Sequence, residues 1–257
     1  MSRHHLVEGA SVDVQIRHSP SFAVARCTLT GGEVLKVQPD AMIAHSPGMQ
    51  LAASVDGGLL RGLKRKALGG ESFFVSTWTA PSEGGFVDVA PYLFGDVFTL
   101  KVESSQSLLI SRGGWVANEQ GVEIDAKWGG MKNLFGGEGG FIVKATGAGD
   151  IVLACLGALD IWDLAAGQKL ILDSNHMVAY DESVNYTLRR AVEGKSIQSM
   201  KSGEGFVFEF TGPGRVYGQT RSPQSFLGWL QTSLGASNSS PTGAGGLLGG
   251  VGALLDR

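Results

Sequence analysis

Apolar and polar positions alternate along most of this chain, in short runs separated by glycine, proline, asparagine or aspartate. Residues 12–17 (VDVQIR) alternate with a period of two, which is typical of a half-buried β-strand. Residues 22–29 and 33–37 have the same character on either side of the turn dipeptide Gly31-Gly32. Runs rich in valine, isoleucine, phenylalanine and threonine predict further strands at 73–79, 97–102, 107–110, 122–124, 141–145, 151–156, 169–172, 186–188 and 206–210.

Helical periodicity is rare in this chain. The best candidate is residues 223–234, with apolar side chains roughly on one face at Phe226, Leu227, Leu230 and Leu234. We therefore expect an all-β protein with one short C-terminal helix. Residues 236–257 are rich in glycine, serine and leucine, which predicts a flexible tail. An alternative for its Gly/Leu-rich end is a short apolar anchor for a partner.

A glycine–glutamate pair followed by an apolar run occurs three times. The glutamates, Glu71, Glu138 and Glu204, are spaced by 67 residues (138 − 71) and then 66 (204 − 138). Each copy follows a strand-like cluster, at 42–44, 115–117 and 177–179, and precedes a glycine turn. A fixed period indicates one unit that is copied and packed against itself. We expect a single triplicated β domain over residues 1–235, with repeats at about 31–95, 105–160 and 168–222 in a pseudo-threefold arrangement.

Composition narrows the class of partner. The 39 glycines are about twice the usual ~7%, and 18% charged residues is below the usual ~25%, so many tight turns between short strands are expected. The net charge of −3 gives no basic field that would recruit nucleic acid or an anionic membrane.

Cysteine use and hydropathy bear on location. Cys27 and Cys155 are too few and too far apart for a disulfide framework, which indicates a reducing compartment. The first residues lack the apolar stretch of a secretion signal. The longest apolar run, 151–159, is about half of the ~18 residues that a membrane span requires. We expect a cytoplasmic protein without a transmembrane segment; peripheral association with a membrane stays open.

Several motifs carry a family resemblance. Residues 203–206 (GEGF) and 211–222 (TGPGRVYGQTRS), with 137–141 (GEGGF) and 146–150 (TGAGD), resemble the bacterial relatives of the fungal "altered inheritance of mitochondria" protein number twenty-four. This family was long described as a domain of unknown function. The resemblance runs over about residues 10–235, and the Gly-Pro-Gly…Gln-Thr-Arg-Ser element is its most specific part.

The resemblance implies a fold similar to that of the tryptophan RNA-binding attenuation protein (TRAP), a flattened β-helix-like sandwich repeated within one chain. The fungal relative is tied to mitochondrial inner-membrane organisation, whereas the bacterial members have no agreed biochemical role. We do not expect the organelle role here, because the chain starts without a mitochondrial presequence. Similarity of fold does not imply binding of tryptophan or RNA, since function resides in sites.

No pattern of catalytic or metal-binding residues stands out. The five histidines form no H-x-H or H-x-x-E-H motif, and no G-x-S-x-G elbow is present. His45 and His176 occupy nearby positions in the first and third repeats and could meet at a pseudo-threefold axis, but the second repeat has no histidine there. We predict no catalytic residue, no metal and no cofactor.

The repeated glutamates Glu71, Glu138 and Glu204 allow two interpretations. They could surround a centre as a cation site or an acid–base pair. We favour a structural role in which each accepts backbone N–H groups of a glycine turn or pairs with an arginine such as Arg215 or Arg221.

The glycine pairs Gly147–Gly149 and Gly212–Gly214 lack the third glycine and the following helix of a dinucleotide site. We therefore predict that they form hairpin turns, as repeated structural motifs.

Two loops are candidate contact surfaces. Residues 61–66 (RGLKRK) include Lys64 and Arg65, which could follow a nucleic-acid backbone, although the low net charge favours a solvated loop. Residues 128–135 hold the large apolar side chains Trp128, Met131, Leu134 and Phe135. Other apolar residues expected in loops are Phe94, Trp115, Trp162 and Trp229.

Together these observations favour a non-enzymatic scaffold or binding module whose partners are further copies of itself, as a homo-oligomer, and unknown proteins. One alternative is a cupin-like small-ligand binder or enzyme, which would need a buried polar cleft containing His45, His176 or the repeated glutamates. A second alternative is an RNA-binding protein that uses Lys64 and Arg65.

Overall fold

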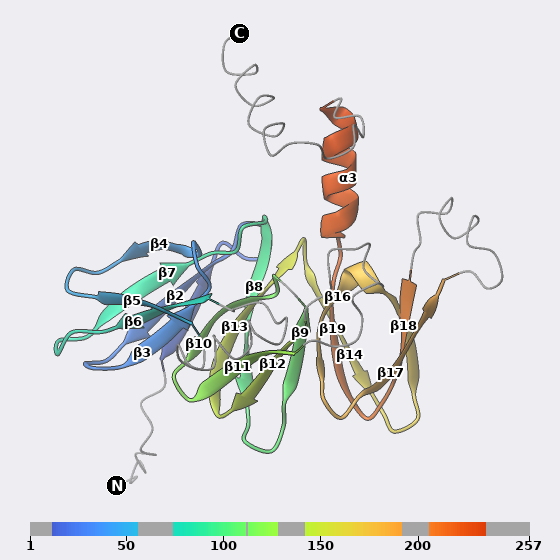
Figure 1. Ribbon diagram of the computed structural model, residues 1–257, viewed down its shortest axis with the longest axis horizontal. Helices are drawn as coiled ribbons and strands as arrows, with labels where there is room; N and C mark the ends of the chain where they lie inside the picture. The colour runs from blue at the N-terminus through green and yellow to red at the C-terminus, as the bar shows by residue number, and fades with distance from the viewer. Residues whose placement is uncertain (1–11, 56–73, 112, 128–141, 192–205, 235–257) are drawn as a thin grey trace, which may run out of the picture. The chain divides into compact units, whose positions relative to one another are not determined.

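The computed structural model describes residues 12–55, 74–111, 113–127, 142–191 and 206–234. The chain divides into two units, Met1–Ser222 and Pro223–Arg257. In the described part, the first unit is built from β-strands with one 3-10 turn, η1 (Ser174–His176), and the second contains helix α3 (Pro223–Ser233) (Figure 1). The prediction of an all-β protein with one short C-terminal helix is confirmed.

The described strands form four antiparallel sheets, which we call sheets A to D. Sheet A has the order β1 (Asp13–Arg17), β2 (Val24–Leu29), β7 (Gly85–Val89), β4 (Met42–His45). Sheet B has the order β5 (Gln50–Val55), β6 (Phe74–Thr79), β3 (Val34–Val37), β10 (Trp115–Glu119), β13 (Gly149–Leu156), β8 (Gly95–Val102). Sheet C has the order β11 (Val122–Lys127), β12 (Ile142–Gly147), β9 (Leu108–Ser111), β16 (Met177–Asp181), β19 (Gly214–Gln219), β14 (Leu159–Leu164). Sheet D has the order β15 (Lys169–Asp173), β18 (Phe206–Thr211), β17 (Asn185–Arg190).

Sheets B and C are built on one plan, each from strands of two stretches of the chain. In sheet B, the strands β5-β6-β3 join β10-β13-β8 through the antiparallel pairing of β3 with β10. In sheet C, the strands β11-β12-β9 join β16-β19-β14 through the pairing of β9 with β16. We call these two pairings the internal joints. Sheet A contains one such half, β2-β7-β4, and sheet D contains the other, β15-β18-β17.

Three hydrophobic cores lie between the sheets: core 1 between A and B, core 2 between B and C, and core 3 between C and D. Each core takes residues from two sheets: Val87 and Leu35 in core 1, Leu153 and Ile110 in core 2, and Val216 and Phe208 in core 3. Sheet B is covered on both faces, which explains why residues 151–156 of β13 are apolar without alternation. Val152 points into core 1 and its neighbour Leu153 into core 2.

A β-bulge recurs at the start of three strands. The pairing register shifts between Met42 and Ala44 in β4, between Trp115 and Ala117 in β10, and between Met177 and Ala179 in β16. A bulge inserts one extra residue and turns its side chain away from the regular alternation. The inserted residues, which we call the bulge residues, are Ile43, Val116 and Val178.

The predicted hairpin turns at Gly147–Gly149 and Gly212–Gly214 are wrong. The first turn connects β12 of sheet C to β13 of sheet B, and the second connects β18 of sheet D to β19 of sheet C. A hairpin requires its two strands to pair with each other. Here each strand pairs with partners in its own sheet, and the turn carries the chain across a core. Glycine is needed because Gly147, Gly149 and Gly214 have φ values of 101°, 145° and 133°.

Candidate functional site

Most residues singled out in the sequence lie outside the described part of the chain. These are the contact residues Lys64, Arg65, Trp128, Met131, Leu134 and Phe135 and the repeated glutamates Glu71, Glu138 and Glu204. Their proposed roles, the count of three repeats and the pseudo-threefold arrangement stay predictions. The glycine turns and Arg215 are described, and they show what holds the crossings between sheets.

Three crossings between sheets, those that lead into β7, β13 and β19, are each held by a side-chain oxygen at the end of a neighbouring strand or directly after it. Asp181 Oδ2 accepts a hydrogen bond from the backbone N–H of Arg215 at 2.9 Å. Glu119 Oε2 accepts one from the N–H of Asp150 at 2.9 Å. Ser46 Oγ accepts one from the N–H of Phe86 at 3.0 Å.

From the sequence, this role was expected of the repeated glutamates, and Ser46, Glu119 and Asp181 were not among the expected residues. A signal for them exists in the sequence. Each lies four residues after the first residue of a strand-like cluster, at 42, 115 and 177. An oxygen-bearing side chain at the end of a strand, facing a glycine turn, indicates such a bond.

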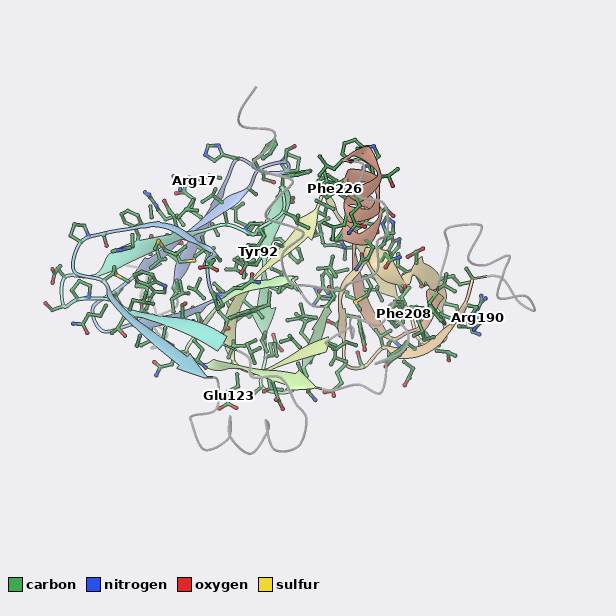
Figure 2. All side chains as sticks on the ribbon, turned by 45° about the horizontal axis from the view of Figure 1, so that its top comes forward. Arg17, Tyr92, Glu123, Arg190, Phe208 and Phe226 are labelled. Atoms are coloured by element: carbon green, nitrogen blue, oxygen red, sulfur yellow. The ribbon has the colours of Figure 1, made fainter. Side chains whose placement is uncertain are left out.

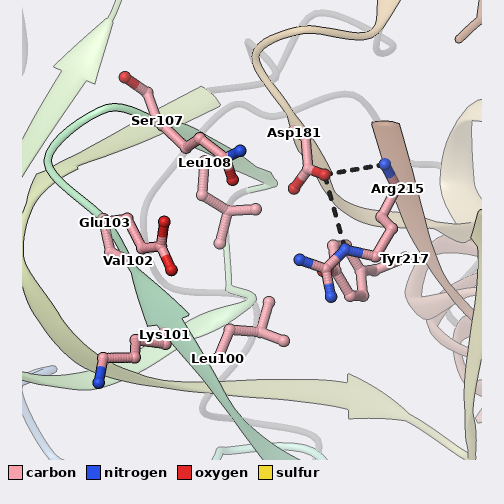
Figure 3. A pocket seen from close by; sticks show the side chains of 10 residues that line it. Leu100, Lys101, Val102, Glu103, Ser107, Leu108, Asp181, Arg215 and Tyr217 are labelled. Atoms are coloured by element: carbon pink, nitrogen blue, oxygen red, sulfur yellow. Dashed lines mark hydrogen bonds and ion pairs between the residues drawn. The ribbon is translucent and has the colours of Figure 1, made fainter. Parts of the chain in front are cut away.

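A small polar cleft of about 160 Å³ opens beside one of these crossings (Figure 3). Its lining includes Lys101, Glu103, Ser107, Asp181, Arg215 and Tyr217. Figure 3 shows Asp181 turned toward Arg215, whose Nε lies 3.7 Å from Asp181 Oδ2. The carboxylate is therefore engaged by both the backbone and the side chain of Arg215.

The chemistry of this cleft favours a structural role. Tyr217 is 1% exposed, and burial, with a smaller contribution from Asp181, raises the pKa of its hydroxyl to about 12. This hydroxyl keeps its proton at neutral pH, so it does not supply a base. Within the described lining, Asp181 already accepts the crossing hydrogen bond. The cleft contains neither His45 nor His176.

The two histidines have separate surroundings. The His45 ring lies 4.8 Å from the Trp78 ring, and its Nδ1 lies 2.9 Å from the carbonyl oxygen of Ser46. His176, in η1, has its Nδ1 2.7 Å from the carbonyl oxygen of Gln219. Over the described ranges, no group of three histidine, cysteine, aspartate or glutamate side chains is placed to hold a metal ion.

Residues 219–221, after the Gly-Pro-Gly turn, tie together the end of β13, the connection from β13 to β14, and η1. Gln219 Oε1 accepts a hydrogen bond from Leu156 N at 2.9 Å, and its Nε2 donates to the carbonyl oxygen of Asn175 at 3.0 Å. Thr220 Oγ1 accepts from Ala158 N at 2.9 Å. Arg221 Nη1 donates to the carbonyl oxygen of Thr220 at 2.8 Å. The most specific motif of the sequence thus fixes backbone geometry.

The outer face of sheet A carries a buried carboxylate, which the sequence analysis did not single out. Asp88 is 4% exposed, and it accepts hydrogen bonds from Arg26 Nε and Nη2 and from Arg17 Nη2, each at 2.8 Å. The hydrogen bonds from Arg26, and the charges of both arginines, lower the pKa of Asp88 below its usual value. The Arg26 guanidinium also lies 4.0 Å from the centre of the Phe86 ring. Figure 2 shows Arg17 in this end sheet and Phe208 among the strands of sheet D.

Each described sheet has two edge strands, and in sheets A and D one of the two takes the place of a strand that is paired on both sides in sheets B and C. In sheet A this strand is β4, with β7 beside it, and in sheet D it is β15, with β18 beside it. We call the outer sides of these strands the two open edges. Each carries an exposed isoleucine, Ile43 (56% exposed) on β4 and Ile171 (57%) on β15. The two open edges are the candidate contact surface.

Large apolar residues that the sequence placed in loops have mixed outcomes. The prediction that Trp115 is a contact residue in a loop is wrong, because it lies in β10 and is 2% exposed. Its Nε1 donates a hydrogen bond to Asn118 Oδ1 at 2.9 Å. Its position in a bulged strand facing core 2 explains the burial. Phe94 is exposed, Trp162 is half-buried in β14, and Trp229 is exposed on α3.

Among the described residues, no helix has the length and apolarity needed to cross a bilayer.

Comparisons with known proteins agree with this architecture. The family described as "Mitochondrial biogenesis AIM24" matches residues 14–221. An uncharacterized protein of Streptococcus pyogenes serotype M6 is 27% identical over 249 residues, which cover 92% of this chain and 98% of that protein. A Streptococcus pyogenes protein of known crystal structure is similar with a TM-score of 0.71 and 22% identity, over 86% of this chain and 99% of that one. The last comparison concerns the fold alone.

Proposed function

This chain belongs to the AIM24 family, and we propose that it is a non-enzymatic scaffold that acts by protein–protein contact through its two open edges. The observation that supports this function is the exposure of Ile43 and Ile171 on strands with an unpaired side in the described chain. Both belong to short strands with an apolar centre, MIAH and KLILD. We further propose that the protein acts in the cytoplasm.

The physical argument is that an open strand edge is a template for pairing. Its backbone N–H and C=O groups are satisfied by water until another strand adds to the sheet. Proteins usually protect such edges with charged side chains or proline, yet the middle of both open edges is apolar. Burying one isoleucine side chain is worth about 1.5–3 kcal/mol. An interface at these edges therefore has both a directional and a hydrophobic component.

The alternatives from the sequence have weaker support. A cupin-like ligand binder or enzyme would place His45, His176 or the repeated glutamates in a polar cleft, and the described lining of the cleft beside Arg215 includes neither histidine. The repeated glutamates lie outside the described residues. RNA binding rests on Lys64 and Arg65, which lie outside the described residues, in a chain of net charge −3.

The function is tested with the protein and a double variant, Ile43→Lys with Ile171→Pro. Both positions are exposed, so the variant is expected to fold, which circular dichroism verifies. We measure mass by sedimentation and binding to host cytoplasmic proteins at matched concentration. The scaffold function predicts association of the unchanged protein, with itself or with host proteins, that the double variant loses. An unchanged protein that stays monomeric and binds no host protein rules it out.

Native mass spectrometry of the same material distinguishes the alternatives. A retained small molecule of fixed mass would support the ligand-binding alternative. Binding of single-stranded RNA at low salt, reduced by Lys64→Ala with Arg65→Ala, would support the RNA alternative.

A further inference from the structure

The two internal joints have the same register. In the joint of β3 with β10, Val37 faces Ala117 and Leu35 faces Glu119. In the joint of β9 with β16, Ile110 faces Ala179 and Leu108 faces Asp181. Both joints are antiparallel, and both follow a bulge in the second strand. The protein thus uses one rule twice to join one half-sheet to the next.

Strand β4 corresponds to β10 and β16. Each pairs on one side with the strand that follows a glycine crossing, and each has its bulge at the same place. The register makes Ala44 the counterpart of Ala117 and Ala179, because each is the first residue after the bulge.

Strand β15 corresponds to β3 and β9. Each pairs on one side with one other strand: β15 with β18, β3 with β6, and β9 with β12. In each pair, a leucine faces a residue that is directly followed by a threonine. The facing pairs are Leu35 with Trp78, Leu108 with Ala145, and Leu170 with Phe210. This makes Leu172 the counterpart of Val37 and Ile110.

Counterpart side chains are buried at the internal joints and more exposed at the open edges. The bulge residues Val116 and Val178 are 0% and 1% exposed inside cores 1 and 2, whereas their counterpart Ile43 is 56% exposed. Val37 and Ile110 are fully buried, whereas their counterpart Leu172 is half-buried at the side of core 3. In the described chain, β4 and β15 each pair on one side only. Their counterparts, β10 and β16 for β4 and β3 and β9 for β15, all pair on both sides.

We propose that β4 of one molecule pairs antiparallel with β15 of a second copy of this chain, in the register of the internal joints. Ala44 then faces Leu172, His45 faces Ile171, and Ser46 faces Leu170. The bulge residue Ile43 enters the side of core 3 of the second copy, as Val116 enters core 1 and Val178 enters core 2. This inference rests on the proposed scaffold function and names its partner.

The result is one sheet with the order β17-β18-β15-β4-β7-β2-β1 that spans two molecules. The surfaces in contact differ, so the interface is head-to-tail, and repetition gives a ring or an open filament. The residues that face each other carry no like charges: Ala44, His45 and Ser46 on one side, and leucine and isoleucine on the other. The Arg26–Asp88 ion pair lies on β2 and β7, where Asp88 faces Ala44 from the side of β4 opposite the joint.

A mixing experiment tests the head-to-tail geometry. Ile43→Lys places a charge at the bulge position that is buried in both internal joints, so it blocks the β4 edge and leaves the β15 edge intact. Ile171→Pro removes a backbone N–H from the β15 edge and leaves the β4 edge intact. Proline is used because the counterpart of Ile171 in the joint of β3 with β10 is Lys36, so a lysine is compatible with the joint. Each variant alone is expected to sediment as a monomer of about 26.9 kDa. An equimolar mixture is expected to form a one-to-one dimer of twice that mass through the intact edges. A variant that self-associates alone, or a mixture that stays monomeric while the unchanged protein assembles, overturns the pairing.

Cysteine pairs test the register. His45→Cys and Ile171→Cys are placed on separate chains that also carry the blocking substitutions Ile171→Pro and Ile43→Lys, respectively. The facing Cβ atoms are expected about 4.5–5.5 Å apart, close enough for mild oxidation to join them. The matched control replaces His45→Cys by Ala44→Cys, whose side chain points to the opposite face. Equal cross-linking in the pair and its control overturns the register.

The outcomes separate the two levels of the argument. Association with host proteins but never with a second copy refutes the pairing and leaves the scaffold function standing. The absence of any association refutes both. Assembly in which the facing cysteine pair cross-links and the control pair does not supports both the pairing and the scaffold function.

Discussion

Asp88 and Arg26 form a two-pronged ion pair between neighbouring strands of sheet A. Arg26 Nε and Nη2 donate to the two carboxylate oxygens of Asp88, each over 2.8 Å. The pair joins β2 to β7 at residues that face each other in the register. Because the side chain of Asp88 is 6% exposed while that of Arg26 is 34% exposed, the carboxylate depends on this partner more than the guanidinium does.

Replacing this carboxylate should lower stability in a pH-dependent way. The folded protein lowers the pKa of Asp88, so its contribution is fully present above the unfolded value of about 3.9 and is lost as the pH falls through the lower folded value. At pH 7 we expect Asp88→Asn to reduce the free energy of unfolding by about 1–3 kcal/mol. Urea unfolding followed by circular dichroism measures this. The variant should also lose less stability than the unchanged protein below about pH 4.

The control for this variant is Glu123→Gln, at an exposed position of β11. Equal stability of Asp88→Asn and Glu123→Gln at pH 7 would show that the buried ion pair is not stabilising.

Gly214→Ala should destabilise the third crossing. Gly214 has a φ of 133°, and an added Cβ would lie 2.6 Å from Ser183 Oγ and 2.7 Å from Val184 Cγ2. Strain and overlap together should cost about 2–4 kcal/mol, measured as a shift in the urea midpoint. Gly167→Ala is the matched control, since Gly167 has a φ of 77° but nothing within 4 Å of an added Cβ. If the two variants lose the same stability, backbone strain alone accounts for the effect.

Gln219→Ala should destabilise the protein more than Gln168→Ala. The Gln219 side chain is half-buried and uses both its oxygen and its nitrogen, toward Leu156 and Asn175. Its loss leaves two backbone groups without partners, for an expected cost of about 2–4 kcal/mol. Gln168 is exposed and accepts one bond, from Ala165 N at 3.0 Å, so its removal should cost less than about 1 kcal/mol. Thermal unfolding of the two variants, compared under identical conditions, decides the order.

Both thiols should be inert in the folded protein. Burial raises the pKa of Cys27 to about 12 and that of Cys155 to about 11. Since the thiolate is the reactive form, alkylation at pH 8 should be slow until the protein unfolds. Mass spectrometry after timed iodoacetamide treatment, with and without urea, measures both rates. Fast modification of either cysteine without urea would contradict the burial of that thiol.

The local elements of this fold follow from the sequence because strand alternation is a local signal. Residues 12–17 and 33–37 alternate and form β1 and β3, and the apolar stripe at 223–234 forms α3. The assignment of strands to sheets does not follow in the same way. A glycine turn between two apolar runs reads as a hairpin whether the runs pair with each other or with other strands. The turns at Gly147–Gly149 and Gly212–Gly214 are of the second kind.

The candidate site was less accessible to sequence reasoning for a physical reason. An open edge is defined by the strand that is missing beside it, and no local pattern in MIAH or KLILD reports this. Asp88 and Arg26 are 62 residues apart, so no local pattern predicts their ion pair either. Ser46, Glu119 and Asp181 share a fixed spacing from their clusters, so these crossing acceptors could have been found.

The shared sheets also dictate an order of events during synthesis. Val37 pairs with Ala117, which is made eighty residues later (117 − 37 = 80), and Ile110 pairs with Ala179, sixty-nine residues later (179 − 110 = 69). Chains emerge from the ribosome N-terminus first, so β3 and β9 each remain unpaired on one side until β10 and β16 have been synthesised. A nascent chain that pauses at these points exposes an unpaired strand edge, which is able to pair with another nascent chain on the same polysome. For β15, no later strand of the described chain arrives, and the temporary condition of β3 and β9 becomes its permanent one.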